Sequence, residues 1–172
     1  MSGPLVVSPL VSAEWLHDNL YTPGVQVIEN AWIPGSYLKG HIPGALCLPC
    51  HPHLKHFDGE EKTQHVMGGG EFADTCFALG MSRDRHYILY DDFHGLFAAR
   101  FWAVCRYYGV DNISVLDGGW NGWVERGYPV ATRVTEAVPG TDIVINPQPH
   151  LIIGQAELQD IHLGTDHQIW DT

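Results

Sequence analysis

Short apolar runs alternate along this chain with segments in which apolar residues recur at helical spacing. Runs rich in β-branched and aromatic side chains predict strands over residues 25–28, 87–90 and 113–116. The run at 87–90 has no polar alternation, as in a central parallel strand covered on both faces. Helical spacing predicts helices over residues 13–20, 70–79, 96–108 and 120–126. Strand, helix and strand in this order predict an α/β fold with a doubly wound parallel sheet.

The ends of the predicted helices carry local signals. Ser12 precedes the first helix, and a serine hydroxyl is a good N-cap acceptor. Gly80 follows the second helix and Gly109 the third, where glycine commonly ends a helix in a left-handed conformation.

After residue 132 the pattern breaks into Pro, Gly, Thr and Asp, and then the opening of the chain returns. The recurring residues, at an offset of 142 or 143, are Ala13, Glu14, Leu16, Asp18 and the strand residues Val27 and Ile28, which match Ala156, Glu157, Leu158, Asp160 and the expected second-copy strand Ile169 and Trp170. A repeat of that length predicts tandem domains. We expect a first domain over residues 7–133, an interdomain linker over 134–149, and the truncated start of a second copy over 150–172. Because so short a second copy cannot bury its own apolar faces, we expect a fragment or an incompletely ordered product.

Charge and composition narrow the classes of function. The formal net charge is −11 and the chain has no lysine/arginine cluster, so nucleic acid is not an expected partner. No apolar run approaches the roughly 20 residues that cross a bilayer. Residues 1–10 carry no positive charge ahead of an apolar stretch, so no secretory signal is visible. With four cysteines and no such signal, the sequence predicts a cytoplasmic protein with reduced thiols and no membrane partner.

The stretch Cys47-Leu-Pro-Cys50-His51 is the most conspicuous short motif. It matches the C-x-x-C-H pattern of covalent haem attachment, but that reaction requires export. With His53 it offers four zinc ligands, yet all four lie within seven residues, whereas a structural zinc site draws on two separated turns. A redox dithiol would need Cys50 at a helix N-terminus. The favoured interpretation is that Cys47 packs as a small apolar side chain, with no metal and no cofactor.

The loop after the predicted strand 87–90 is the main candidate site. In a doubly wound sheet, ligands bind at the carboxyl ends of the strands, against the N-terminus of the next helix. Converging backbone amides there would suit an anion such as a thiolate, a phosphate or a sulfur oxyanion. The chain carries Asp91 at this point, which can serve as the N-cap of the helix. A carboxylate cannot carry a sulfane sulfur, so no nucleophile is expected there.

Two longer motifs occupy residues 37–48, YLKGHIPGALCL, and residues 117–130. The first resembles the rhodanese family pattern of an aromatic residue followed by H-[ILV]-P-G-A. Here His41 is expected to anchor a turn, and Pro43 and Gly44 to redirect the chain into a strand. The second motif, residues 117–130, contributes Gly118, Gly119 and Trp120. The similarity extends over about residues 7–133 and implies a rhodanese-like domain.

The resemblance implies a role in sulfur transfer. Rhodaneses with two copies of the domain usually place the catalytic cysteine in the second copy, and the first typically carries Asp, as Asp91 does here. The whole protein would then transfer sulfane sulfur from thiosulfate or 3-mercaptopyruvate to cyanide or a thiol through a cysteine persulfide. The implied partners are a second rhodanese domain of the same protein, a small anionic sulfur donor and a thiophilic acceptor. This chain alone is expected to be inactive.

In this family the first domain lines one wall of a cleft that it shares with the second. By position, Trp32, Leu96 and Phe97 are candidates for that wall, although ordinary core packing would also suit each of them. The alternative function is a stand-alone, cysteine-less rhodanese-like module that binds a partner or an anion. Such a module would end near Arg133, so the truncated repeat favours the enzyme fragment. A phosphatase-like function also needs a loop cysteine, and Asp91 counts equally against it.

Overall fold

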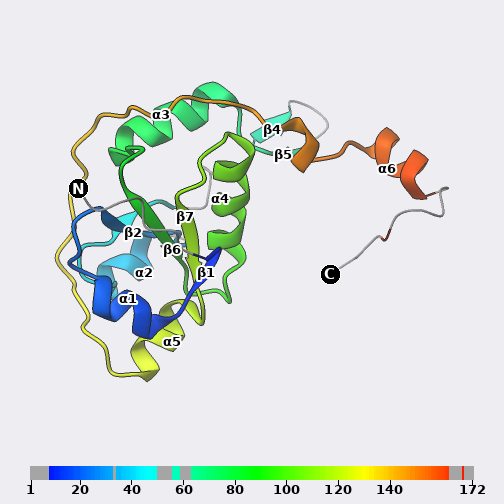
Figure 1. The fold of residues 1–172 in the computed structure, drawn as a ribbon. Coiled ribbons are helices and arrows are strands. Elements are labelled where there is room, and N and C mark those ends of the chain that lie inside the picture. The colour runs from blue at the N-terminus through cyan, green and yellow to red at the C-terminus, as the bar shows by residue number, and fades with distance from the viewer. Residues whose placement is uncertain (1–7, 33, 50–55, 59–62, 163–167, 169–172) are drawn as a thin grey trace.

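A five-stranded parallel sheet forms the centre of the computed structural model, which describes residues 8–32, 34–49, 56–58, 63–162 and 168 (Figure 1). The strands are β1 (Leu10–Val11), β2 (Val25–Glu29), β3 (Leu46–Cys47), β6 (His86–Tyr90) and β7 (Ile113–Leu116). Their spatial order is β1-β7-β6-β2-β3, and every pairing is parallel. β6 lies in the middle and is buried along its whole length, as its uninterrupted apolar run predicts. A separate antiparallel hairpin pairs β4 (His56–Asp58) with β5 (Thr63–His65).

Helices cover both faces of the sheet and enclose two cores. On one face α3 (Gly69–Leu79) and α4 (Leu96–Tyr107) pack over Ile28 and Leu89. On the other face α1 (Ala13–Asn19), α2 (Pro34–Lys39) and α5 (Gly119–Glu125) pack over Val27 and Ile88. Successive residues of β2 and β6 therefore point to opposite faces. The α/β fold expected from the sequence is confirmed.

The predicted elements agree with the observed ones to within one residue at each end. The Ser12 hydroxyl accepts a hydrogen bond from the Trp15 amide at 3.1 Å, which confirms the predicted N-cap. Gly80 ends α3 in the left-handed conformation, with φ of 64°. The strand expected after Pro43 and Gly44 is β3. The sequence pattern missed β1, α2, β4 and β5, because elements of two to six residues are too short to show a period.

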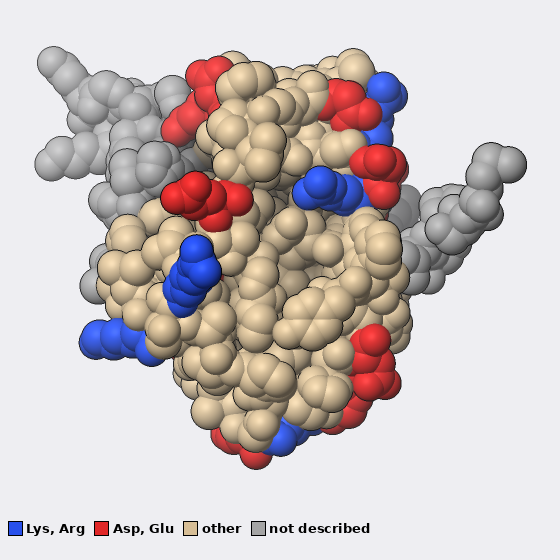
Figure 2. All heavy atoms as spheres, turned by 90° about the vertical axis from the view of Figure 1, so that its left-hand side faces the viewer, with Lys and Arg blue, Asp and Glu red and all other residues tan. Residues whose placement is uncertain are grey.

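Residues 132–148 follow the domain surface in an extended course, and we call this segment the strap. In Figure 1 it rises along the left-hand side and passes over α3, and Figure 2 views that side, where charged side chains stand scattered. Backbone amides of the strap donate to helix carbonyls, namely Gly140 to Phe77 at 2.8 Å, Asn146 to Tyr108 at 3.1 Å and Gln148 to Tyr107 at 2.7 Å. Ala137, Ile143 and Ile145 pack against the α3/α4 core. The predicted boundary at residue 133 thus cuts through these contacts, and a linker role for the strap stays a prediction.

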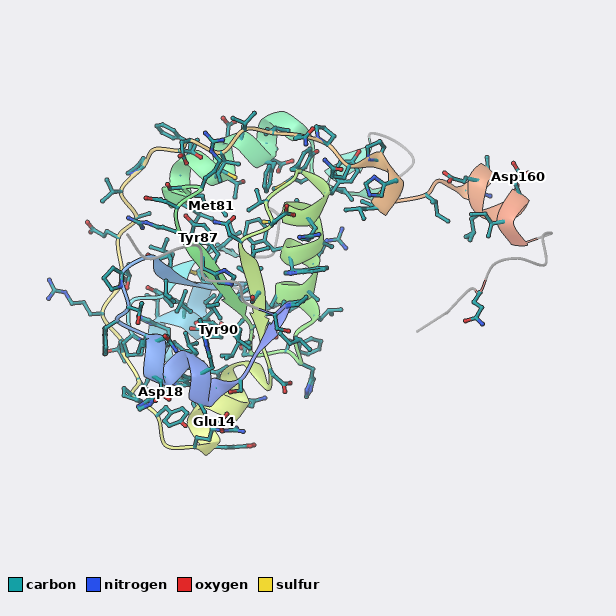
Figure 3. The ribbon with its side chains drawn as sticks, in the orientation of Figure 1. Glu14, Asp18, Met81, Tyr87, Tyr90 and Asp160 are labelled. Atoms are coloured by element: carbon teal, nitrogen blue, oxygen red, sulfur yellow. The ribbon has the colours of Figure 1, made fainter. Side chains whose placement is uncertain are left out.

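Beyond the strap the chain leaves the domain. η1 (Pro149–Leu151) and α6 (Gln155–His162) stand to one side, and Asp160 on α6 lies far from Tyr90 in the centre of the domain (Figure 3). Residues 149–160 are all exposed. The predicted second-copy strand at 169–170 lies outside the described residues, so the assignment of 150–172 to a second domain also stays a prediction. None of the helices among the described residues is long and apolar enough to cross a membrane.

Candidate functional site at the carboxyl ends of the strands

The loop between β6 and α4 folds four backbone N–H groups around one carboxylate. Asp91 follows β6 directly and is only 1% exposed. Its Oδ1 accepts hydrogen bonds from the amides of Phe93 at 2.9 Å and Gly95 at 2.7 Å. Its Oδ2 accepts from the amides of Phe97 at 2.7 Å and Ala98 at 2.9 Å. We call this arrangement the Asp91 cradle. Because hydrogen bonds to a carboxylate are stronger than those between neutral groups, the four amides hold the Asp91 side chain in one orientation.

Two residues in the left-handed conformation make this convergence possible. His94 has φ of 58° and Gly95 has φ of 83°, and together they turn the chain so that α4 begins with its free amides toward Asp91. The N-cap position is held by Gly95. The prediction that Asp91 is the N-cap residue is therefore wrong in position. Its carboxylate still caps α4 from four residues earlier, because it bonds the amides that an N-cap side chain would take.

The second family motif closes the cradle from the neighbouring strand. The Trp120 amide donates to the Asp91 carbonyl at 2.9 Å. Gly119 has φ of 49°, and a Cβ there would lie 2.7 Å from the same carbonyl oxygen, so no side chain fits. Gly118, with φ of 75°, is the N-cap of α5. The three residues predicted as a structural motif thus lie directly beside the candidate site.

A groove of about 930 Å³ opens beside the cradle. The structure brings the three predicted wall residues, Trp32, Leu96 and Phe97, together in its lining. The ring centroids of Trp32 and Phe97 are 5.1 Å apart. Trp32 and Leu96 are 49% and 59% exposed, so these two are surface residues rather than core. Phe97 is 5% exposed and also belongs to the α3/α4 core.

Sequence analysis missed most of the groove's other lining. Further lining residues are Lys39, Asp92, Phe93, Trp120 and Val130. They come from α2, the β6–α4 loop, α5 and the segment after it, so only the fold brings them together. The groove is largely apolar and aromatic, with the charged side chains of Lys39 and Asp92 on its lining.

A buried acid on the α1/α2/α5 side of the sheet was also missed. Tyr90 donates a short hydrogen bond to the Glu29 carboxylate and accepts one from the Ile42 amide at 3.1 Å. Glu29 is 3% exposed. Burial raises the pKa of Glu29 to about 7 against the opposing hydrogen bond from Tyr90, and the nearby negative charges of Asp92 and Asp91 raise it further. The one signal of this buried acid in the sequence was that a predicted apolar strand is followed directly by a glutamate, Glu29.

The first family motif forms a turn that meets the start of the strap. The amides and carbonyls of His41 and Ala131 pair in both directions at 2.9 Å. The Ala45 amide donates to the Ile42 carbonyl at 3.0 Å, across Pro43 and Gly44. Gly44 has φ of 78°, which favours glycine. His41 and this turn are therefore positioned as the motif leads one to expect.

The three thiols among the described residues are unsuited to nucleophilic chemistry. Burial, followed by the charge of Glu29, raises the pKa of Cys47 to about 11, and burial raises that of Cys76 to about 12. Burial also raises the pKa of Cys105 well above its ordinary value. Cys47 packs against the α1/α2/α5 core, which confirms its predicted structural role. The other members of the cysteine motif, Cys50, His51 and His53, lie outside the described residues.

The family model described as a rhodanese-like domain matches residues 12–126, which is well over half of the sequence. With the fold and the cradle, this match shows that the chain belongs to the family of rhodanese-like domains.

Several of the similar proteins with curated names are sulfurtransferases. The thiosulfate/3-mercaptopyruvate sulfurtransferase 2 of Arabidopsis thaliana is 35% identical over 137 residues, which cover 74% of this chain and 39% of that protein. The thiosulfate sulfurtransferase of Bos taurus is 33% identical over 150 residues, covering 76% and 48%. The crystal structure of the 3-mercaptopyruvate sulfotransferase SseA from Escherichia coli superimposes with a TM-score of 0.74 at 25% identity, over 89% of this chain and 61% of that one. The chain spans about half the length, or less, of the curated relatives it matches.

Proposed function

We propose that this chain is the non-catalytic first half of a two-domain sulfurtransferase that moves sulfane sulfur from thiosulfate or 3-mercaptopyruvate to cyanide or a thiol. The observation that carries the proposal is the Asp91 cradle. Four backbone N–H groups converge at the place where a nucleophilic thiolate would be held, and a carboxylate fills that place. A carboxylate has no sulfur with which to form a persulfide. Catalysis must then come from a second copy of the domain.

The chemistry assigned to that second copy is covalent and proceeds in two steps. A cysteine thiolate attacks the outer sulfur of thiosulfate, the S–S bond of the donor breaks, and sulfite leaves with the bonding electron pair. The cysteine now carries the sulfur as a persulfide. Cyanide attacks the outer sulfur, the new S–S bond breaks, and thiocyanate leaves as the thiolate is restored.

The role proposed for this half is to supply one wall of a shared cleft. Trp32, Leu96 and Phe97 line a groove whose largely apolar surface is open in this chain. A second domain packed over the groove would exclude water from a persulfide and protect it from side reactions. The exposed apolar residues Ile152, Ile153 and Leu158 support the view that residues 150–172 begin such a domain. Free thiols at Cys47, Cys76 and Cys105 support a reducing, cytoplasmic setting.

A thiosulfate:cyanide transferase assay on this chain is expected to return no turnover above the uncatalysed rate. The physical reason is the carboxylate in the cradle, together with buried thiols whose raised pKa keeps them protonated near neutral pH. The measurement is thiocyanate release over time. The bovine relative serves as the positive control for the assay.

A second readout follows the sulfur itself. The chain is incubated with thiosulfate, and intact mass is then measured under non-reducing conditions. We expect no added mass of one sulfur atom. Turnover, or a persulfide on any of the four cysteines, would overturn the proposal and leave the cysteine-less binding module excluded as well.

A further inference from the structure

The groove beside the Asp91 cradle carries two side chains of opposite charge on a lining whose other described residues are uncharged. One is Asp92, in the loop that follows β6, and the other is Lys39, the last residue of α2. Among the described residues, neither side chain forms an ion pair or a hydrogen bond, and the two do not pair with each other. A negative and a positive charge that the described chain leaves unpaired therefore face one space.

The rest of the lining suits the apolar part of a small ligand. The ring centroids of Trp32 and Phe97 are 5.1 Å apart, and those of Phe93 and Phe97 are 5.7 Å apart, so these three rings form a continuous aromatic wall. Trp120 adds a fourth ring to the lining. Sites for small molecules are largely apolar hollows of roughly 300–1,000 Å³ with a few placed polar groups. The groove, at about 930 Å³, matches that description.

The two charges restrict what can fill the groove. An anion would be repelled by Asp92, and a cation would be repelled by Lys39. An apolar cover alone would take both charges out of water without giving either a partner, which is costly. A ligand with an ammonium group at one end and a carboxylate at the other provides each charge with its opposite.

We propose that the groove binds a small zwitterionic α-amino acid, with its ammonium group at Asp92 and its carboxylate at Lys39. Asp92 follows the buried Asp91 directly and is half-buried, so its carboxylate has a defined place. The Lys39 ammonium stands on a flexible four-carbon stem and can move to meet the ligand's carboxylate. The ligand's side chain then lies on the aromatic wall. This inference goes beyond the proposed function and does not depend on sulfur transfer, because it assigns a ligand to this half itself.

The first test is an NMR titration of the whole chain at neutral pH with L-methionine. Its thioether packs well against aromatic rings, and it has no thiol that could take part in sulfur transfer. Decarboxylated methionine keeps only the ammonium group, and deaminated methionine keeps only the carboxylate. We expect the dissociation constant of L-methionine to be at least about fivefold lower than that of either single-charge compound. The indole signals of Trp32 and Trp120 should shift on binding, whereas that of Trp102, outside the groove lining, should not.

The second test exchanges each charge of the groove for a neutral side chain. Asp92→Asn should weaken the binding of L-methionine and of the decarboxylated compound by about fivefold, and should not weaken that of the deaminated compound. Lys39→Met should weaken L-methionine and the deaminated compound to a similar degree, and spare the decarboxylated one. The two substitutions change the net charge of the chain in opposite directions, so a general charge effect cannot produce both losses.

The matched control is Glu136→Gln, which also removes one negative charge but lies on the exposed strap outside the groove lining. It should bind L-methionine as the native chain does. The proposal is wrong if L-methionine binds no more tightly than the single-charge compounds, or if neither Asp92→Asn nor Lys39→Met weakens its binding. Either result would leave Asp92 and Lys39 to pair with side chains of a second domain, and would not touch the proposed lack of activity in this half.

Discussion

Asp91 shows how one side chain can fill a site whose walls are backbone. The amides of Phe93, Gly95, Phe97 and Ala98 converge on position 91, and the positive φ of His94 and Gly95 together with the start of α4 sets their directions. An acceptor with two charged oxygens satisfies all four donors. A neutral or shorter side chain leaves some of them buried without a partner.

Asp91→Asn is expected to lower the free energy of unfolding by about 2–4 kcal/mol. The asparagine amide offers only one acceptor oxygen, and its NH2 group would face backbone N–H groups that need an acceptor. Chemical denaturation measures the loss. Asp92→Asn is the matched control, since Asp92 lines the groove and takes no part in the cradle; its effect should stay within about 0.5 kcal/mol. Equal losses for the two variants would contradict the role given to the cradle.

Glu29 gives the protein an unusual dependence of stability on pH. Its pKa rises from 4.5 to about 7 on folding, so the folded state keeps a proton that the unfolded state has already lost. The contribution of Glu29 to the free energy of unfolding is therefore fully present below about pH 4.5, decreases as the pH rises through about 7, and is lost above that. The fall attributable to Glu29 is at most about 3 kcal/mol. Denaturation midpoints between pH 4.5 and 8 should show it, and Glu29→Gln should flatten it. A variant curve that parallels the native one would show that other groups cause the slope.

Elements with a clear period were predictable, and elements fixed by distant contacts were not. β6 contains the uninterrupted apolar run 87–90, and α4 carries Phe97, Phe101 and Val104 on its buried side, so both followed from the pattern. The groove was predicted only in part, through Trp32, Leu96 and Phe97. The pairing of Glu29 with Tyr90 joins residues 61 positions apart, and the contact of His41 with Arg133 joins residues 92 apart. No local pattern encodes such contacts.

The strap meets α3 at Gly80, where space as well as conformation requires glycine. A Cβ on Gly80 would clash with the Val138 carbonyl, whereas a Cβ on Gly127 would meet nothing within 4 Å, and the two glycines have similar φ of 64° and 68°. Gly127→Ala therefore reports only the cost of the left-handed conformation, about 1–2 kcal/mol.

We expect Gly80→Ala to cost at least about 1 kcal/mol more than Gly127→Ala, because the strap must also move. Denaturation gives the difference, and limited proteolysis within residues 136–146 reports the displacement of the strap. The same loss of stability for both substitutions, with no new cleavage, would show that the strap leaves room for a side chain at position 80.

At the scale of the whole molecule, packing contacts define two parts. One is the domain together with its strap, and the other is the exposed extension that contains η1 and α6. η1 and α6 lie outside both cores, while Ala137, Ile143 and Ile145 of the strap pack on one of them. The unit held together by packing therefore runs past the predicted boundary at residue 133 and includes the strap.

Removal of residues 149–172 is expected to leave the stability of the domain within about 0.5 kcal/mol of the full chain. Removal of residues 134–172 is expected to cost about 2–4 kcal/mol, since it exposes apolar surface on the α3/α4 core and frees helix carbonyls. Thermal and chemical denaturation of the three lengths of chain gives both values. If the domain keeps its stability after the longer deletion, the contacts of the strap with α3 and α4 contribute little to the free energy of unfolding.

The strap also fixes the starting point of whatever follows it. Its last amide, that of Gln148, bonds the carbonyl of Tyr107 at the end of α4, whereas the groove lies at the first residues of the same helix. At 1.5 Å per residue, the twelve residues of α4 separate the two points by roughly 18 Å. A polypeptide that continues from residue 149 must therefore span at least this separation before any part of it can cover the groove.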